Sequence, residues 1–374
     1  MKIINGIVFS ENGVFEKRDV NICEGRFCQT DTADTDVINA EGLYVIPGLV
    51  DIHFHGCMGY DFCDGTKEAL DAITSYEASQ GVTSITPATM TLSEEMLTKI
   101  FANAGAYENS EGSALRGINM EGPFVSEAKK GAQNGAYLHK PDVDFFQKMQ
   151  KLSGGLIKQV AVAPEEDENL NFTKTLKDEV VISVAHTTAD YDTAKAAFDA
   201  GACHVTHLFN AMPNFSHRAP GVVGAAFDSK DVAVELICDG IHIHPSMVRS
   251  VFALFGAQRV CMVSDSMMAT GLKDGQYALG GQPVNVKGRL ATLENGTIAG
   301  SASNLMECLR VAVKEMGIPL ADAVLASTAT PARSLGLYDE CGSITAGKSA
   351  DAVLLDQDLN IVQVICRGKC LINK

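Results

Sequence analysis

The chain has 374 residues, of which 20% are charged and 46% hydrophobic, and its formal net charge is −16. This length is sufficient for one barrel-sized domain with a smaller domain beside it. The acidic balance disfavours nonspecific binding to nucleic acid or to an anionic membrane surface. A negatively charged small substrate would therefore need a local basic pocket.

The 11 cysteines are odd in number and include no Cys-x-x-Cys pair. This pattern favours reduced thiols, most of them packing groups, over a disulfide framework. The sequence also has no secretory segment at Met1 and no apolar run long enough to span a bilayer. We therefore expect a cytoplasmic protein that binds neither nucleic acid nor membranes.

The two ends of the chain share a β-rich character. Residues 1–47 alternate short apolar runs with Asn-Gly and Glu-Gly turn signals, and similar runs return at residues 350–355, 361–366 and 369–372. Neither end is long enough to bury a core of its own. The pattern predicts one small β-sandwich domain built from both chain ends, residues 1–47 and 335–374.

Strand-like and helix-like segments alternate between these ends. Strands are expected at residues 50–55, 82–86, 115–120, 157–162, 180–185, 204–208, 232–238 and 260–264. Helices are expected at residues 67–80, 93–105, 189–200, 245–255, 304–316 and 320–327. Eight strands alternating with helices over residues 48–334 predict an α/β fold, a TIM-like (β/α)8 barrel, rather than an open doubly wound sheet. A hairpin-containing loop is expected within residues 271–300.

The stretch from Val45 to Gly59 reads VIPGLVDIHFHGCMG and places two histidines one residue apart. If residues 50–55 form a strand, His53 and His55 point to the same face, because side chains alternate along a strand. Two imidazoles on one face, directly before a glycine-rich loop, favour a metal site over two incidental polar residues.

Other predicted strands also end in side chains that bind metals. These residues are Glu121 at the third strand, His186 at the fifth, His207 at the sixth and Asp265 at the eighth. All strand carboxyl ends of a parallel barrel lie on one face, so the four side chains should converge with the histidine pair. Six such residues at five strand ends are difficult to explain as isolated polar groups.

Nitrogen and carboxylate ligands without thiolates suit Zn²⁺ first, with Fe²⁺, Mn²⁺ or Co²⁺ as alternatives. Such a divalent metal, with an open position, activates water at neutral pH. Asp265 is the predicted general acid/base, which takes a proton from that water and returns it to a leaving nitrogen. The sequence leaves open whether Asp265 also contacts the metal. Cys57 is a weak candidate ligand close to the histidine pair.

Several motifs resemble the amidohydrolase superfamily, namely PGLVDIHFHG, MEGPF, AHTTA, THLFNAM, VSDSMMATG and GSITAGKSADAVLLD. Within it the chain is similar to the N-acetylglucosamine-6-phosphate deacetylases, through THLFNAM with a following Arg and EGPF followed by KKGAQ. The resemblance covers essentially the whole chain. It implies hydrolysis of the acetamide of N-acetyl-D-glucosamine 6-phosphate to D-glucosamine 6-phosphate and acetate, in amino-sugar catabolism. It also implies a metal-bearing barrel with a small β domain, in a homodimer.

Carried over residue by residue, the resemblance makes Glu121, His186 and His207 the ligands of the main metal and Asp265 the acid/base. It places Ala132, Gln133, Asn210 and Ala211 in the sugar pocket. It assigns Arg218 and His242 to the phosphate, with Asp239, Gly240 and Ile241 framing the pocket, and it closes Ile298, Ala299 and Gly300 over the acetyl group. His139, His204, His217 and His244 are expected to be ordinary histidines, and strand parity turns His204 away from His207.

Three other functions remain open at this stage. One is a deacetylase that prefers N-acetylgalactosamine 6-phosphate. Another is a cyclic-amide hydrolase, although no lysine ends the fourth predicted strand, where such enzymes carry a carboxylated lysine. The third is a non-catalytic assembly protein, although none of the expected ligands has been lost. Since both His53 and His55 are present, we expect a site able to hold two divalent ions, with Asp265 and Glu121 helping to complete the second.

Overall fold

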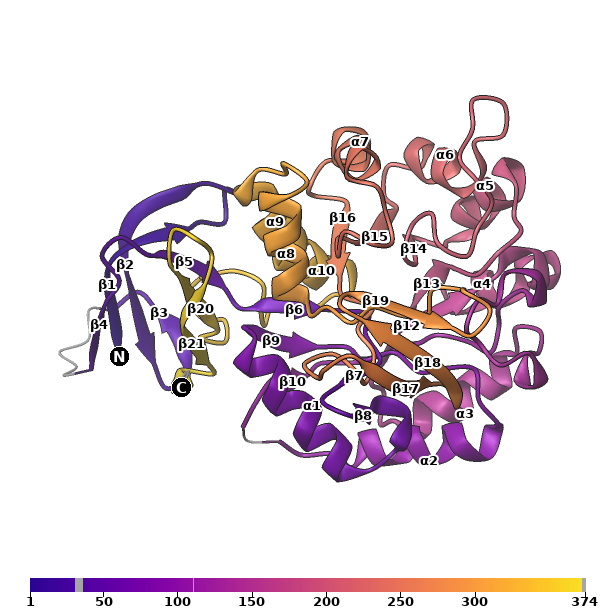
Figure 1. Cartoon of the computed structure of the whole chain (residues 1–374), viewed down its shortest axis with the longest axis horizontal. Coiled ribbons are helices and arrows are strands. Elements are labelled where there is room, and N and C mark those ends of the chain that lie inside the picture. Colours follow the sequence, from indigo (N-terminus) through magenta and orange to yellow (C-terminus); the bar gives the residue numbers. More distant parts are fainter. Residues whose placement is uncertain (31–35, 110, 372–374) are drawn as a thin grey trace.

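Parallel strands form the inner wall of the larger part of the molecule, seen in a computed structural model that describes residues 1–30, 36–109 and 111–371 (Figure 1). All eight expected strands are present, and all but β12 are shorter than predicted: β6 (Leu49–Asp51), β9 (Val82–Ile85), β11 (Ile118–Met120), β12 (Ile157–Val162), β13 (Val181–Val184), β14 (His204–Val205), β15 (Ala233–Ile237) and β16 (Val260–Val263). The expected (β/α)8 barrel is therefore confirmed. A short strand, β10 (Ala114–Leu115), pairs with β9 just before β11.

Hydrogen bonds beyond the regular ladders close the barrel at the carboxyl ends of its strands. Strands β11 to β16 form one parallel sheet, and β6, β9 and β10 form another. The Asn119 amide donates to the Pro87 carbonyl at 3.0 Å, which joins the two sheets on one side. On the other side the Asp265 amide donates to the His53 carbonyl at 2.9 Å. The first and last strands therefore meet where the candidate ligands lie.

Helices cover the outside of this wall (Figure 1). They are α1 (Lys67–Ser79), α2 (Glu94–Gly105), α3 (Val143–Leu152), α4 (Asn171–Leu176), α5 (Tyr191–Ala200), α6 (Gly221–Asp228), α7 (Pro245–Phe255), α8 (Leu305–Lys314), α9 (Leu320–Ser327) and α10 (Ala329–Ser334). Six begin after a side chain that accepts a first-turn amide, as helix caps do; these side chains are Thr66, Ser93, Asp142, Asp190, His244 and Asn304. Of the helices that the structure describes, none has both the length and the apolar character required to cross a membrane.

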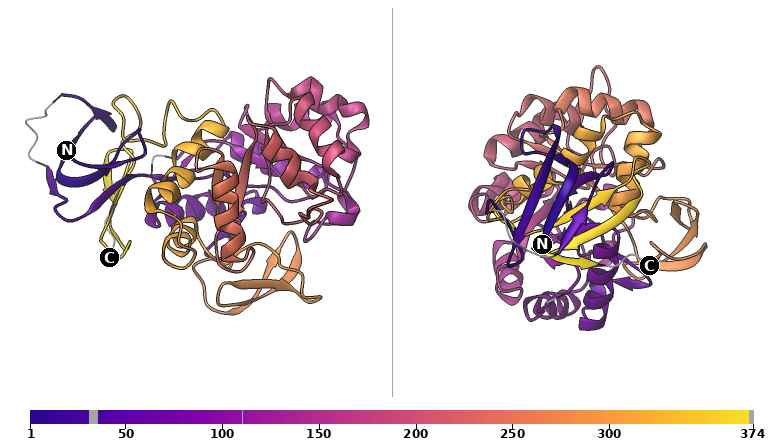
Figure 2. Two further views of the ribbon diagram at one scale, coloured as in Figure 1. Left: turned by 90° about the horizontal axis from the view of Figure 1, so that it is seen from above. Right: turned by 90° about the vertical axis from the view of Figure 1, so that its left-hand side faces the viewer.

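The expected hairpin loop after the eighth strand is a three-stranded antiparallel sheet. It consists of β17 (Gly275–Leu279), β18 (Gln282–Lys287) and β19 (Leu290–Leu293), and it projects from the barrel (Figure 2). The Gln282 amide donates to the Ala132 carbonyl, and Arg289 pairs with Glu315 at 3.1 Å. These contacts hold the sheet beside the loops at the barrel mouth.

Both chain ends meet in a second, mostly antiparallel sheet beside the barrel (Figure 2). Its strands are β1 (Lys2–Phe9), β2 (Phe15–Cys23), β3 (Arg26–Cys28), β4 (Val37–Asn39), β5 (Tyr44–Pro47), β20 (Ala352–Leu355), β21 (Ile361–Cys366) and β22 (Lys369–Leu371). The order β22-β21-β20-β5-β1-β2-β3 is continuous, so the expected sandwich is hydrogen-bonded as a single sheet around one apolar core. Residue 372 of the last expected strand, and residues 31–35, lie outside the described part.

One expectation about the cysteines is wrong. Cys23 and Cys28 form a disulfide with a Cα–Cα distance of 5.9 Å. The reason is local: the strands β2 and β3 turn back on each other at Glu24 and Gly25, both with positive φ, which brings the two thiols to adjacent strands. The other nine cysteines are free, as predicted.

Candidate metal centre and active site

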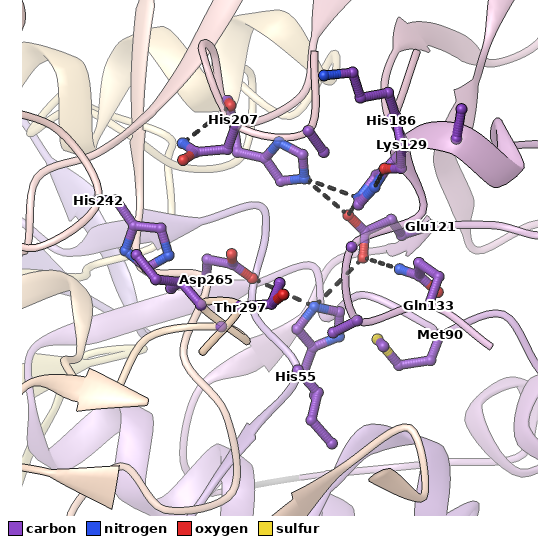
Figure 3. Close-up of a pocket in the computed structure, with 18 residues that line it drawn as sticks. His55, Met90, Glu121, Lys129, Gln133, His186, His207, His242, Asp265 and Thr297 are labelled. Atoms are coloured by element: carbon purple, nitrogen blue, oxygen red, sulfur yellow. Dashed lines mark hydrogen bonds and ion pairs between the residues drawn. The ribbon is translucent and has the colours of Figure 1, made fainter. Parts of the chain in front are cut away.

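The six residues predicted as metal ligands or acid/base converge at the carboxyl ends of the barrel strands, and Figure 3 labels five of them: His55, Glu121, His186, His207 and Asp265. They form two groups: the first consists of Glu121, His186 and His207, and the second of His53, His55 and Asp265. All six are buried. The sequence therefore predicted correctly that these side chains lie together.

The backbone reaches this arrangement differently from the prediction. Strand β6 ends at Asp51, so His53 and His55 lie beyond it rather than on its face. His186, His207 and Asp265 each lie two residues after a strand end and have positive φ values of 41°, 27° and 49°. Non-glycine residues adopt such values only where the surrounding structure enforces them, often at functional sites. These left-handed turns, and not strand parity, aim the side chains inward.

In the first group, three acceptor-type atoms lie almost in contact. Glu121 Oε1 is 3.1 Å from His186 Nε2 and 3.2 Å from His207 Nε2, and the two Nε2 atoms are 3.1 Å apart. His186 Nδ1 lies 2.9 Å from the Lys129 carbonyl oxygen, which can only accept, so Nδ1 carries a proton and Nε2 is the nitrogen that faces Glu121 and His207. A lone-pair nitrogen so near a second nitrogen and a carboxylate needs a cation or a proton between them.

The second group is more open. His55 Nε2 lies 3.3 Å from Asp265 Oδ1 and 3.4 Å from Glu121 Oε2. His53 Nε2 lies 3.4 Å from Glu121 Oε1 and 3.8 Å from Asp265 Oδ1. Glu121 therefore stands between the two groups, with one carboxylate oxygen toward each histidine of the pair.

The electrostatics of the two carboxylates suit ligand roles. Burial would raise the pKa of Glu121, but the charge of His53 and hydrogen bonds from His186 and His207 outweigh it and hold the pKa well below its ordinary value. Burial likewise opposes ionisation of Asp265, yet its hydrogen bond with His55 and the charge of His53 lower its pKa. Both carboxylates are therefore ionised at neutral pH.

The residues present fit a divalent cation. His53 Nε2, which faces Glu121 and Asp265, is buried and makes no hydrogen bond to any residue that the structure describes. A tetrahedral Zn²⁺ with ligand distances of about 2.0–2.2 Å separates its ligands by roughly 3.3 Å, close to the spacing within the first group. The donor set of imidazoles and carboxylates is that of a divalent metal site. Cys57 belongs to neither group; its buried thiol lies near Glu77 instead.

A cavity of about 410 Å³ opens onto both groups. This volume lies within the usual range of about 300–1,000 Å³ for small-molecule sites. Of the predicted substrate-binding residues, those lining the cavity are Ala132, Gln133, Asn210, Ala211, His242, Ile298 and Gly300.

Five predicted substrate-binding residues do not line the cavity: Arg218, Asp239, Gly240, Ile241 and Ala299. Arg218 is exposed on the loop before α6, which carries it to the surface of this chain. Asp239 is fully buried, and Ala299 is buried behind its neighbours. For these five residues, the role that the resemblance implies stays a prediction.

Two of the predicted substrate-binding residues, Asp239 and Gln133, hold other side chains in place by hydrogen bonds. Asp239 Oδ2 accepts from His242 Nδ1 at 2.7 Å, and its Oδ1 accepts the Ile241 and His242 amides. Gln133 uses both ends of its amide, because Oε1 accepts the Thr91 amide at 2.6 Å and Nε2 donates to Glu121 Oε2 at 2.9 Å. Asp239 therefore orients His242, and Gln133 orients Glu121.

Burial would lower the pKa of His242, but the hydrogen bond and charge of Asp239 raise it above the ordinary value of 6.5. A histidine with a raised pKa keeps its positive charge at higher pH. His242 is therefore suited to facing an anionic group in the cavity.

Sequence reasoning missed other lining residues: Met90, Ala128, Lys129, Gly131, Leu279 and Thr297. Lys129 stood in the KKGAQ motif beside two predicted residues, so its position was an available signal. Leu279 and Thr297 come from the projecting sheet and its return loop, and no pattern in the sequence places that sheet beside the barrel mouth. His204, expected to face away from His207, lies with its Nε2 3.2 Å from buried Glu235.

Comparison with known proteins agrees with this geometry. The model of the Amidohydrolase family matches residues 44–371. An N-acetylglucosamine-6-phosphate deacetylase of Bacillus subtilis is 38% identical, over 96% of this chain and 94% of its own. An N-acetylgalactosamine-6-phosphate deacetylase of Escherichia coli is 29% identical, over 97% of each chain.

Solved structures give the same result. A mutant N-acetyl-D-glucosamine-6-phosphate deacetylase from Mycobacterium smegmatis, in complex with N-acetyl-D-glucosamine-6-phosphate, has a TM-score of 0.92 and 31% identity, covering 100% of this chain and 99% of its own. The corresponding enzyme of Thermotoga maritima has a TM-score of 0.88 and 30% identity, covering 100% of both chains. The chain therefore belongs to the amidohydrolase family, and within it groups with the N-acetylglucosamine-6-phosphate deacetylases.

Proposed function

We propose that this protein hydrolyses the acetamide of N-acetyl-D-glucosamine 6-phosphate to D-glucosamine 6-phosphate and acetate. The observation that carries the proposal is the cavity over the two ligand groups, with Asp265 at its floor and His242 at its side. Relatives that share the whole chain are named for this activity. The reaction belongs to amino-sugar catabolism.

Glu121, His186 and His207 would hold the main cation, and His53, His55 and Asp265 a second one. The ion would be Zn²⁺ by preference, with Fe²⁺, Mn²⁺ or Co²⁺ as alternatives. A divalent cation in such a site supplies Lewis acidity, which acidifies water and polarises an amide carbonyl.

Asp265 acts as the general acid/base. Its carboxylate is ionised and faces the cavity beside His55, so it can accept a proton from water at Oδ1. The water oxygen bonds to the acetyl carbon, and Asp265 Oδ1 then donates that proton to the amide nitrogen as the C–N bond breaks, which releases acetate and the amine. Gln133 orients Glu121, since its Nε2 donates to Glu121 Oε2 while the Thr91 amide holds the Gln133 side chain itself.

The sugar phosphate would be held at the other side of the cavity. His242 offers Nε2 to the phosphate because Asp239 occupies Nδ1. Asn210, Ala211 and Ala132 would contact the sugar, with Ile298 and Gly300 over the acetyl group. Gly240, Ile241 and Ala299 would act through the backbone that frames these contacts.

Arg218 is exposed in a single chain, so we propose that it reaches the phosphate of a partner subunit in a homodimer. Phe215 lies in the same loop with 43% of its surface exposed, and such an interface would bury its apolar ring. We also propose a cytoplasmic enzyme, with a small domain of residues 1–47 and 335–374 and a barrel of residues 48–334.

The galactosamine epimer is the second candidate substrate, because a relative matching 97% of the chain is named for it. The test is acetate release from N-acetylglucosamine and N-acetylgalactosamine, each with and without the 6-phosphate. We expect N-acetylglucosamine 6-phosphate to give the highest kcat/KM. A higher value for the galactosamine epimer would reassign the substrate, and no release from either phosphosugar would exclude the deacetylase function.

A further inference from the structure

A fully buried carboxylate lies in the barrel interior beneath the two ligand groups. Glu235, in the middle of β15, is 0% exposed. Its Oε2 accepts from His53 Nδ1 at 2.7 Å and from the His207 amide at 3.1 Å. Its Oε1 accepts from Gln159 Nε2 at 2.7 Å and lies 3.2 Å from His204 Nε2.

This position would ordinarily hold an aliphatic side chain. Interior positions of parallel barrels are filled mainly by Val, Ile and Leu, and a buried carboxylate is unfavourable unless it is fully partnered. Glu235 draws its partners from three other segments of the barrel: the loop after β6, strand β12 and the region around β14. Such a network is more than packing requires.

The contact with His53 fixes that ring chemically. An ionised carboxylate can only accept, so His53 Nδ1 carries a proton and Nε2 is the nitrogen left to bind a cation. That Nε2 lies 3.4 Å from Glu121 Oε1 and makes no hydrogen bond to a described residue. Metal-binding histidines commonly have their other ring N–H held by a carboxylate in this way.

The contact with His207 reaches the first group. The same oxygen, Oε2, accepts the backbone amide of a residue whose φ is 27°. That unusual backbone turns the His207 ring toward Glu121 and His186. One oxygen of Glu235 therefore touches one residue of each ligand group.

We infer that Glu235 is a positioning residue, which sets the tautomer of His53 for a second cation and ties that site to the His207 backbone of the first. The inference rests on the proposed metal-dependent function. It adds a residue to which neither the motifs nor the relatives' names assign a role.

The test is zinc binding by purified protein, measured by equilibrium dialysis against Zn²⁺. We expect Glu235→Gln to weaken the second zinc by about 10–100-fold, while the first zinc still binds. Glu77→Gln is the matched control, because Glu77 is a buried glutamate in α1 whose carboxylate makes no hydrogen bond to a described residue. That control should retain wild-type zinc binding.

A double-mutant cycle separates positioning from general destabilisation. If Glu235 acts through His53, then Glu235→Gln should weaken the second zinc no further in a chain that already carries His53→Gln. Additive losses, or an unchanged second site in Glu235→Gln, would overturn the inference. A wild-type chain that never binds a second zinc would also overturn it.

If Glu235→Gln does not fold, Glu235→Asp decides, since it keeps the charge and shortens the reach to His53. It should weaken the second zinc, and wild-type affinity would contradict the inference. The ¹⁵N shifts of His53 in the zinc-loaded protein give a further readout: the Nδ1–H tautomer should dominate in the wild type and not in Glu235→Gln. Acetate release by the wild type is measured separately, so failure of the deacetylase function is distinguishable from failure of this inference.

Discussion

The two ligand groups differ in how closely they are drawn together and in what fixes them. In the group of Glu121, His186 and His207, the facing atoms lie 3.1–3.2 Å apart, and a loop carbonyl fixes the His186 ring. In the group of His53, His55 and Asp265, the corresponding contacts span 3.3–3.8 Å, and a buried carboxylate fixes the His53 ring from beneath.

This difference indicates a division of roles. The closer group resembles a complete site for one cation, since its three atoms already have the spacing that an ion imposes. The more open group shares Glu121 with it and includes Asp265, the residue that must also move a proton. A second ion there would be bound more weakly, because its ligand Asp265 must also transfer a proton.

The largest expected effect comes from substitution of Asp265, which belongs to the more open ligand group and is also the general acid/base. Asp265→Asn removes the proton acceptor and a negative charge while keeping the shape. We expect kcat to fall by about three orders of magnitude or more, with the fold and sugar binding retained. Acetate release over a range of sugar concentrations measures kcat and KM, and circular dichroism measures the fold. Turnover within about tenfold of the wild type would remove Asp265 from the mechanism.

Substitution of Arg218 tests whether a residue outside both ligand groups recognises the phosphate of the substrate. We expect Arg218→Ala to cost about 1.5–3 kcal/mol in kcat/KM for the phosphosugar, about 10–150-fold, through loss of a charge-assisted contact. Hydrolysis of unphosphorylated N-acetylglucosamine should change little. Equal losses on both sugars would show that Arg218 supports its loop and does not contact the phosphate.

Gln133 sharpens the comparison between the groups, because its amide holds the Glu121 oxygen that faces His55. Gln133→Leu should weaken a second zinc by about tenfold and the first by less. Zinc titration of the variant beside the wild type measures both affinities. A larger loss at the first site would mean that Gln133 serves the closer group instead.

The smallest expected effect is a pH dependence at His242, away from both groups. Its pKa is raised above 6.5, so its protonated form and the stability it adds are fully present below pH 6.5 and are lost as pH rises through the raised pKa. KM for the phosphosugar should therefore increase over that upper range. Asp239→Asn should move the increase to lower pH. An unshifted KM profile in that variant would remove the Asp239–His242 pair from phosphate binding.

The sequence was sufficient for the fold and for the membership of both groups. Eight apolar segments at regular spacing predicted the barrel, and ligand-type residues at their ends predicted convergence, since parallel strands share one carboxyl face. What it could not show was how His186, His207 and Asp265 turn inward. Positive φ at a non-glycine residue is imposed by tertiary contacts and has no sequence signal.

Contacts between segments far apart in the chain also could not be predicted from the sequence. Glu235 stood within a predicted strand and had no motif around it, so only the assembled barrel shows its partners on β12 and near β14. Arg218 followed a recognised motif, yet its loop leads to the surface. The Cys23–Cys28 disulfide spans a predicted Glu-Gly turn, but the odd cysteine count favoured free thiols.

The measurement that tests the division of roles most directly is zinc content and acetate release of the His53→Gln, His55→Asn double variant, after reconstitution with excess Zn²⁺. We predict about two ions per chain for the wild type and about one for the variant, which should keep turnover within about tenfold because the closer group is intact. A wild type that never exceeds one ion, matched by the variant in zinc content and affinity, would contradict the account.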